Sequence, residues 1–280
     1  MPMLQDDIRE HYEANWRQAD ETAASAAALR YSSPLEDAVL YPAYRQLIAD
    51  LALINDDTRL LDVGSGSGRW IKFFTEHYRP ASVTGVDFTE AAVQLLKRWY
   101  PPTPTTATTF EQRDITEPNL DLGDTFDLIN IANVLFHIPE HDRYAQALKN
   151  LATHLAPGGR IVTTEYLPRT TMRTEWMLVR SRYEFARLIE QAGLKIVTTR
   201  AFCFFANDPL GLDGPDGGTR GEFGRVRTLM AQLLSATDEK SRAFLVNMMA
   251  DIERACVSFA RERVAECDLP SQKLVVLARR

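Results

Sequence analysis

Residues 60–69, with the sequence LLDVGSGSGR, decide the fold of this chain. The stretch is a short apolar run that is stopped by glycines, which is typical of a buried parallel strand followed by a tight turn. Glycine allows positive φ angles and lets the backbone approach a ligand closely. We therefore expect a ligand-binding turn at residues 64–68 and a helix that begins at Arg69.

Strands and helices alternate after this turn, which predicts a parallel sheet with right-handed crossovers. Thr89 is expected to cap one helix, and Ser181 opens an S-x-x-E capping box for another. The expected strands after the first are 82–86, 108–112, 126–131, 160–164, 194–205 and 273–278. The fold class is therefore α/β, a doubly wound, Rossmann-like sheet of seven mostly parallel strands.

Four segments are expected along the chain. Residues 1–56 form an N-terminal helical lid, with Ile8, Tyr12 and Trp16 on one stripe, and residues 57–206 form the α/β core. Residues 207–270 are a helical insertion, and residues 271–280 give the last strand. The insertion serves either as an acceptor lid or as a homodimerisation element. Its expected apolar stripe and wall consist of Phe204, Phe205, Met230, Phe244, Met248, Met249, Ile252, Cys256 and Phe259.

Three acidic residues follow the first three strands: Asp62, Asp87 and Asp114. Ligands of open parallel sheets bind outside the carboxyl ends of the strands, so these side chains are expected to meet at one crevice. A carboxylate after the second strand can accept both ribose hydroxyls. A carboxylate after the third strand can accept hydrogen bonds from an exocyclic amine. Asp62 lies where an ammonium group needs a negative partner.

Several further motifs carry a resemblance to class I S-adenosylmethionine-dependent methyltransferases. They are the glycine turn, the acid after the second strand, R-D-I at 113–115, F-D-L-I-N-I-A-N-V-L-F-H-I at 126–138 and L-A-P-G-G-R-I-V at 155–162. The resemblance covers residues 60–205 and the last strand. It implies an enzyme of the small-molecule, metal-independent type with S-adenosyl-L-methionine as cofactor. The implied cofactor-binding residues are Tyr12, Asp62, Gly64, Gly66, Asp87, Phe88, Asp114, Ile115 and Ala132.

Two alternatives remain at this point. A nicotinamide-dependent oxidoreductase carries G-x-G-x-x-G, but here Gly64, Gly66 and Gly68 are followed by Arg69 where the third glycine of that motif belongs. A donor-binding regulatory protein without turnover would keep the same acids.

His137 is the candidate general base, because it follows the fourth strand on the donor side of the sheet. A purely structural role for it stays open. The resemblance implies that an N-terminal tyrosine pairs with this histidine, which makes Tyr12 the second candidate catalytic residue. Side chains expected to bind the acceptor are Trp16, His137, Glu165, Tyr166, Arg169 and Phe205.

Composition restricts the partners. The net charge of −6 argues against a nucleic-acid partner, and no apolar run reaches the roughly 18 residues of a membrane span. Three scattered cysteines and the absence of ligand clusters argue against a metal. The sequence therefore predicts a cytoplasmic enzyme that methylates an oxygen, nitrogen or carbon atom of a small-molecule acceptor with an apolar part.

Overall fold

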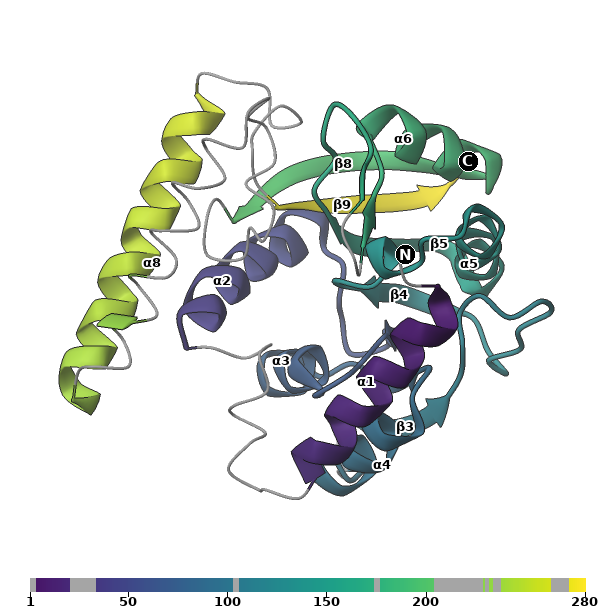
Figure 1. Ribbon diagram of the computed structural model, residues 1–280, viewed down its shortest axis with the longest axis horizontal. Coiled ribbons are helices and arrows are strands. Elements are labelled where there is room, and N and C mark those ends of the chain that lie inside the picture. Colours follow the sequence, from purple (N-terminus) through teal and green to yellow (C-terminus); the bar gives the residue numbers. More distant parts are fainter. Residues whose placement is uncertain are drawn as a thin grey trace.

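The computed structural model describes residues 4–20, 34–102, 106–173, 177–203, 229, 232–233, 238–262 and 272–280 (Figure 1). The helices are α1 (Gln5–Asp20), α2 (Pro34–Leu51), α3 (Arg69–His77), α4 (Glu90–Trp99), the 3₁₀ turn η1 (Leu135–His137), α5 (His141–His154), α6 (Arg182–Gln191) and α8 (Glu239–Arg261). The strands are β1 (Arg59–Val63), β2 (Ser82–Asp87), β3 (Ala107–Gln112), β4 (Phe126–Ile131), β5 (Leu155–Glu165), β6 (Met172–Arg173), β7 (Leu178–Val179), β8 (Leu194–Cys203) and β9 (Gln272–Arg279). No helix in these ranges has the length and apolarity that crossing a membrane requires.

The seven-stranded sheet has the order β3-β2-β1-β4-β5-β9-β8. Strands β1 to β5 pair in parallel, and β9 runs antiparallel between β5 and β8. Strand β8 therefore runs parallel to the first five, as the sequence predicts. Since the order reverses between β1 and β4, the crevice for a ligand lies at the carboxyl ends of these two strands. The predicted doubly wound fold is confirmed.

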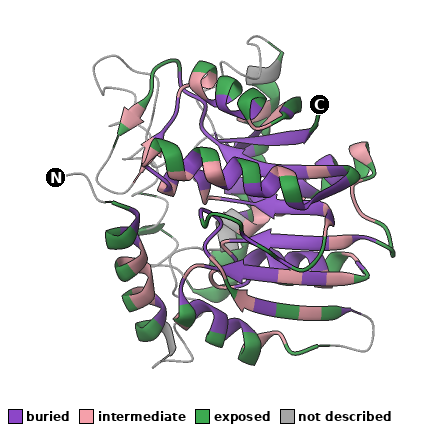
Figure 2. Cartoon of the chain, turned by 90° about the vertical axis from the view of Figure 1, so that its right-hand side faces the viewer, coloured by how far each residue is buried: buried purple, intermediate pink, exposed green. Residues whose placement is uncertain are grey.

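Alternate residues of each strand point into two separate hydrophobic cores, one on each face of the sheet. Because both sets are apolar, the strands are continuous apolar runs in the sequence. Leu60 packs with α2, α3 and α8, whereas Leu61 packs with α5 and α6. Buried residues accordingly run along the strands, and the helices carry exposed residues on the sides turned away from the sheet (Figure 2). The sheet is thus held rigid from both sides, and its edge can position a site.

Some boundaries differ from the expectation. Strand β5 begins at Leu155 rather than Arg160, and its pairing with β4 shifts register between Phe126 and Leu128. The Pro157-Gly158-Gly159 segment therefore lies inside the strand and does not merely precede it. The β6–β7 hairpin, which follows β5, has no counterpart among the predicted strands.

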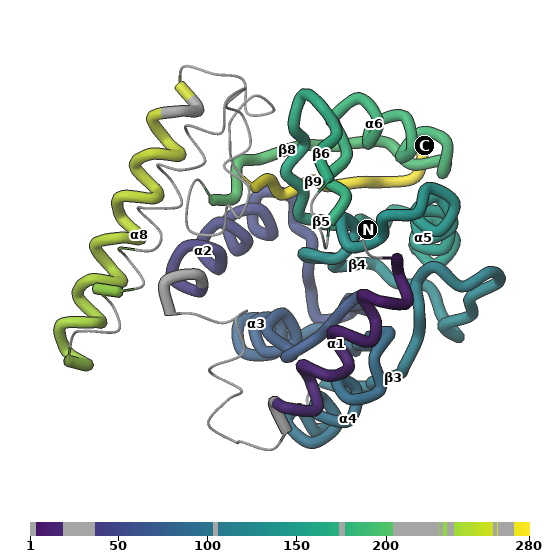
Figure 3. Tube along the Cα trace, in the orientation of Figure 1, coloured from purple at the N-terminus to yellow at the C-terminus, as the bar shows by residue number. Residues whose placement is uncertain are grey.

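The long helix of the insertion lies at the margin of the molecule, beside α2 (Figure 3). Met249, Ala250 and Glu253 are buried, but Phe244, Ile252 and Phe259 of the predicted stripe are about half or more exposed, at 68%, 48% and 60%. The apolar stripe therefore faces outward and the opposite face packs inward. Phe204, Phe205 and Met230 of the expected acceptor wall lie outside the described residues, and both expected roles of the insertion, acceptor lid and dimerisation, stay predictions.

Replacement of Ser181 tests the helix cap that the sequence predicts. The Ser181 hydroxyl accepts a hydrogen bond from the Glu184 backbone N–H (3.2 Å) at the start of α6. We expect Ser181→Ala to lower the free energy of unfolding by about 1 kcal/mol, because one N–H of the first turn loses its partner. Urea denaturation measures this, with Ser181→Asn as the control that keeps a capping oxygen. Equal losses in both variants would contradict the capping role.

Candidate active site

The glycine turn after β1 is anchored to the end of β2. The backbone N–H groups of Gly64 and Ser65 donate to the Val86 carbonyl (2.8 and 3.1 Å), and the Gly66 N–H donates to Asp87 Oδ2 (3.0 Å). Gly64 and Gly66 have φ angles of +68° and +51°. A Cβ on Gly66 would lie 3.0 Å from Trp16, so glycine is required both for the turn and for the approach of α1.

Asp87 is buried and already holds several donors. Its Oδ1 accepts hydrogen bonds from the Thr89 backbone N–H (2.9 Å) and the Thr89 hydroxyl (2.6 Å). The Thr89 hydroxyl therefore fixes Asp87 instead of capping α4, as the sequence had suggested. Burial raises the pKa of the Asp87 carboxyl, against the lowering effect of the Thr89 and Gly66 hydrogen bonds.

Asp62 lies in a buried chain of side chains that reaches α2. The Tyr44 hydroxyl donates to Asn130 Oδ1 (2.5 Å), and Asn130 Nδ2 donates to Asp62 Oδ1 (2.6 Å). Among the described residues, Asp62 Oδ2 has no hydrogen-bond partner. Burial raises the pKa of Asp62 to about 7, although the bond from Asn130 opposes this. Asp62 is thus a buried acid with one oxygen available for a cationic group.

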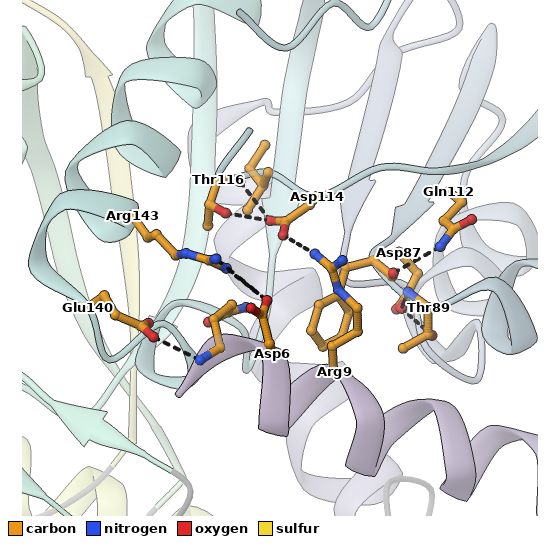
Figure 4. Close-up of polar contacts among 12 residues, drawn as sticks. Asp6, Arg9, Asp87, Thr89, Gln112, Asp114, Thr116, Glu140 and Arg143 are labelled. Carbon is orange, nitrogen blue, oxygen red and sulfur yellow. Dashed lines mark hydrogen bonds and ion pairs between the residues drawn. The ribbon is translucent and has the colours of Figure 1, made fainter. Parts of the chain in front are cut away.

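Asp114 is held rigidly at the start of the loop after β3. Its Oδ1 accepts the Thr116 backbone N–H (2.9 Å) and the Thr116 hydroxyl (2.7 Å). Its Oδ2 forms an ion pair with Arg9 of α1 (Figure 4). Because both oxygens are engaged, the orientation of this carboxylate is fixed by its neighbours.

A cavity of about 370 Å³ connects these features. Its volume lies in the range of small-molecule and cofactor pockets. Of the predicted site residues, the cavity wall contains Tyr12, Trp16, Gly64, Gly66, Asp87, Phe88, Asp114, Ile115, Ala132, His137 and Tyr166. Asp62 directly precedes the wall residues Val63 and Gly64 in the chain. The structure therefore gathers most of the predicted residues around one volume.

Helix α1 closes one side of this cavity. Gln5, Tyr12 and Trp16 line it, and the Tyr12 hydroxyl oxygen lies 3.3 Å from His137 Nε2. The two rings meet edge to face, with centroids 5.6 Å apart. The predicted pair of Tyr12 and His137 is thus in contact, whereas the lid and catalytic roles remain predictions.

Two expected acceptor residues do not line the cavity, and a third is not described. Glu165 and Arg169 are not among the residues that line the cavity, and Phe205 lies outside the described residues. Glu165 is buried at the end of β5 and accepts a hydrogen bond from Thr163 (3.4 Å), whereas the next residue, Tyr166, lines the cavity. The acceptor roles of Glu165, Arg169 and Phe205 stay predictions.

Glu165 instead belongs to a buried charged cluster beneath η1. Burial raises its pKa to about 8, and the charge of Arg180 opposes the rise. The Arg180 guanidinium lies over the Tyr144 ring (3.6 Å to its centroid) and donates to the Ile138 carbonyl (3.1 Å). The cluster therefore supports the backbone that directly follows His137.

Sequence reasoning missed Arg9, Gln5 and Asn130. Arg9 follows Gln5 at four-residue spacing, and Tyr12 and Trp16 continue the same helical row. The sequence shows this spacing. Because Ile8, Tyr12 and Trp16 also form an apolar stripe, the helix face was interpreted as core packing. The sequence did not single out Asn130 as a site residue, because it lies inside a strand whose residues are mostly apolar.

Comparisons with known proteins bear on this arrangement. Residues 60–159 match a family model described as a methyltransferase domain. A demethylmenaquinone methyltransferase of Thermus thermophilus is 31% identical over 128 residues, which cover 45% of this chain and 54% of the relative. The chain thus spans about half the length of that curated relative.

Solved structures show the same fold. A SAM-dependent methyltransferase of Leishmania major is 21% identical, with a TM-score of 0.56 over 70% of this chain and 76% of that one. A chain from the complex between the Haloferax volcanii Trm112 methyltransferase activator and its methyltransferase is 16% identical, with a TM-score of 0.51 over 96% of both chains. At these identities the likeness concerns the fold alone.

Proposed function

We propose that this chain, which carries a class I S-adenosylmethionine-dependent methyltransferase domain over residues 60–159, methylates a small molecule with an apolar part. The observation that carries the proposal is the cavity itself, which joins the acids at the strand ends to an apolar wall. The family match favours this activity over a nicotinamide-dependent oxidation. The missing third glycine at Arg69 agrees with that choice.

The residues present fit the cofactor. Asp62 Oδ2 is buried without a hydrogen-bond partner among the described residues, and a methionine ammonium group would satisfy it. Asp87 lines the cavity where ribose hydroxyls need an acceptor. Ile115 and Phe88 provide apolar surfaces beside Asp114 for an adenine ring. When bound, S-adenosylmethionine supplies an electrophilic methyl group on a sulfonium.

The acceptor end of the cavity is apolar and aromatic. Phe136 and Tyr166 pack at an interplanar angle of 52° with centroids 5.5 Å apart, and Met177 packs against them. All three line the cavity. This wall supports an acceptor with a substantial apolar part. The name of the Thermus relative, which specifies a quinone, agrees with such an acceptor.

His137 and Tyr12 stand between the two ends of the cavity. For a hydroxyl acceptor, the residues must remove one proton as the carbon–oxygen bond forms, and a histidine imidazole suits this task. We assign that step to His137, with Tyr12 holding the ring through its hydroxyl (3.3 Å). For an amine acceptor that is already neutral, positioning alone suffices, and His137 then only orients Tyr12.

The raised pKa of Asp62 gives a test of cofactor binding. Because its folded-state pKa of about 7 exceeds the ordinary aspartate value of 3.8, ionisation of Asp62 costs the folded state increasing free energy as pH rises through this window. A bound ammonium removes that cost. We therefore expect S-adenosylhomocysteine to bind more tightly as pH rises towards 7, with release of up to about one proton per molecule bound at about pH 6.5.

Calorimetric titration in two buffers of different ionisation enthalpy measures this proton release. Asp62→Asn should bind more weakly and release no proton. Asp121→Asn, at an exposed loop position, is the matched control and should behave as the unaltered protein. Binding that is independent of pH in the unaltered protein would contradict the assignment of Asp62.

Turnover is tested with S-adenosylmethionine labelled in the methyl group and a panel of quinols, phenols and aromatic amines. We expect label to reach a member with an apolar ring. With a hydroxyl acceptor, His137→Gln should lower kcat about 100-fold, because the proton has no base, while the Kd of S-adenosylhomocysteine changes by less than about threefold.

His141→Gln, on the exposed start of α5, is the control for loss of a histidine and should keep kcat. A His137→Gln variant with unchanged kcat would assign this histidine a structural role. Tight binding of S-adenosylhomocysteine without transfer to any acceptor would contradict the enzyme and favour a donor-binding regulatory protein.

A further inference from the structure

Arg9 is the polar residue of α1 that reaches the adenine end of the proposed cofactor site. Its guanidinium pairs with Asp114 Oδ2 and lies over the Phe88 ring, 5.7 Å from the centroid (Figure 4). Both partners are residues that the cofactor assignment places around the adenine. Arg9 thus links the N-terminal helix directly to the part of the site that recognises the base.

Arg9 approaches this end of the site from outside the cavity. Phe88, Asp114 and Ile115 line the cavity, and Arg9 does not. The Arg9 side chain is 39% exposed, whereas Asp114 is 7% exposed. Since a carboxylate oxygen has two lone pairs, Asp114 Oδ2 can accept from Arg9 on the outer side and from an adenine amine on the inner side.

Other polar contacts hold the same helix to the core. The Gln5 backbone N–H donates to Glu140 Oε1 (2.8 Å), and Arg143 pairs with Asp6 (3.4 Å). Further along, Glu13 Oε2 accepts the Ala91 backbone N–H (3.3 Å) at the start of α4. These contacts tie the first turn and the middle of α1 to the core. The Arg9 pair lies between them, over the cofactor pocket itself.

We infer that Arg9 is a positioning residue for the cofactor: it fastens α1 over the adenine end of the pocket and orients Asp114 for the adenine amine. This inference rests on the proposed function. Gln5, Tyr12 and Trp16 of α1 form part of the cavity wall, so contacts that hold α1 against the core also keep this wall in place around a bound cofactor. The Arg9 contact does so through Asp114, which the proposed function places at the adenine amine.

The dissociation rate of S-adenosylhomocysteine, measured by stopped-flow displacement, tests this inference. We expect Arg9→Ala to release the nucleoside about three- to tenfold faster, because a charge-assisted hydrogen bond and a cation–π contact are both lost. Arg9→Lys should lie between, since lysine keeps the charge without the planar fork. Glu10→Ala is the control: Glu10 is on the same helix and its side chain is exposed.

Two further measurements distinguish the loss of the Arg9 contact from a general loss of structure. Between about 0.05 and about 0.5 M NaCl the release rate of the unaltered protein should rise, and Arg9→Ala should lose most of that dependence. In an Asp114→Ala background, Arg9→Ala should accelerate release much less than it does in the unaltered protein, because only the cation–π contact with Phe88 is left to lose.

The opposite results overturn the inference. If Arg9 instead occupies the place of the adenine amine on Asp114, Arg9→Ala will bind S-adenosylhomocysteine more tightly than the unaltered protein. Equal release rates in all variants would likewise exclude a role for Arg9. Failure of the unaltered protein to bind the nucleoside at all would reject the proposed function itself, so the two failures are distinguishable.

Discussion

The hydrogen bond from the Gly66 backbone to the Asp87 carboxylate is the contact on which the site depends. It fixes a turn with two positive φ angles against the end of the neighbouring strand, and the Val86 carbonyl completes the anchor. Because β1 and β2 pair in parallel and in register, the turn, Asp62 and Asp87 are placed by the sheet rather than by a flexible loop. Trp16 then packs against Gly66, which brings α1 over the same crevice.

Buried acids flank this arrangement on both faces of the sheet. Asp62 is supported by Asn130 and Tyr44, and Glu165 lies beside Arg180. Burial of a carboxyl group is unfavourable unless neighbours hydrogen-bond or neutralise it, and the pKa of each of these two acids is raised accordingly. The two acids differ in their partners: Asp62 Oδ2 has no hydrogen-bond partner among the described residues, whereas Glu165 lies near Arg180, which donates to the Ile138 carbonyl directly after His137.

Most of the fold and much of the cofactor end of the site were predictable from the sequence. Apolar strands, glycine stops and an acid at each strand end are local signals, and parallel topology brings them together. The sequence does not tell which of Glu165 and Tyr166 lines the cavity, because adjacent residues at the end of a strand point to opposite faces. It also does not tell that the stripe of α8 faces outward, because the helix packs on α2 through Met249 and Ala250. Arg9 was missed because its partner Asp114 lies 105 residues away.

One calorimetric experiment tests the central claim, that the Asp87-anchored turn holds a sulfur nucleoside. The protein is titrated in parallel with S-adenosylmethionine, S-adenosylhomocysteine and NAD. We expect micromolar binding of both sulfur nucleosides, little binding of NAD, and loss of affinity in Asp87→Ala. Binding of NAD alone, or of the sulfur nucleosides equally well in Asp87→Ala, would contradict it.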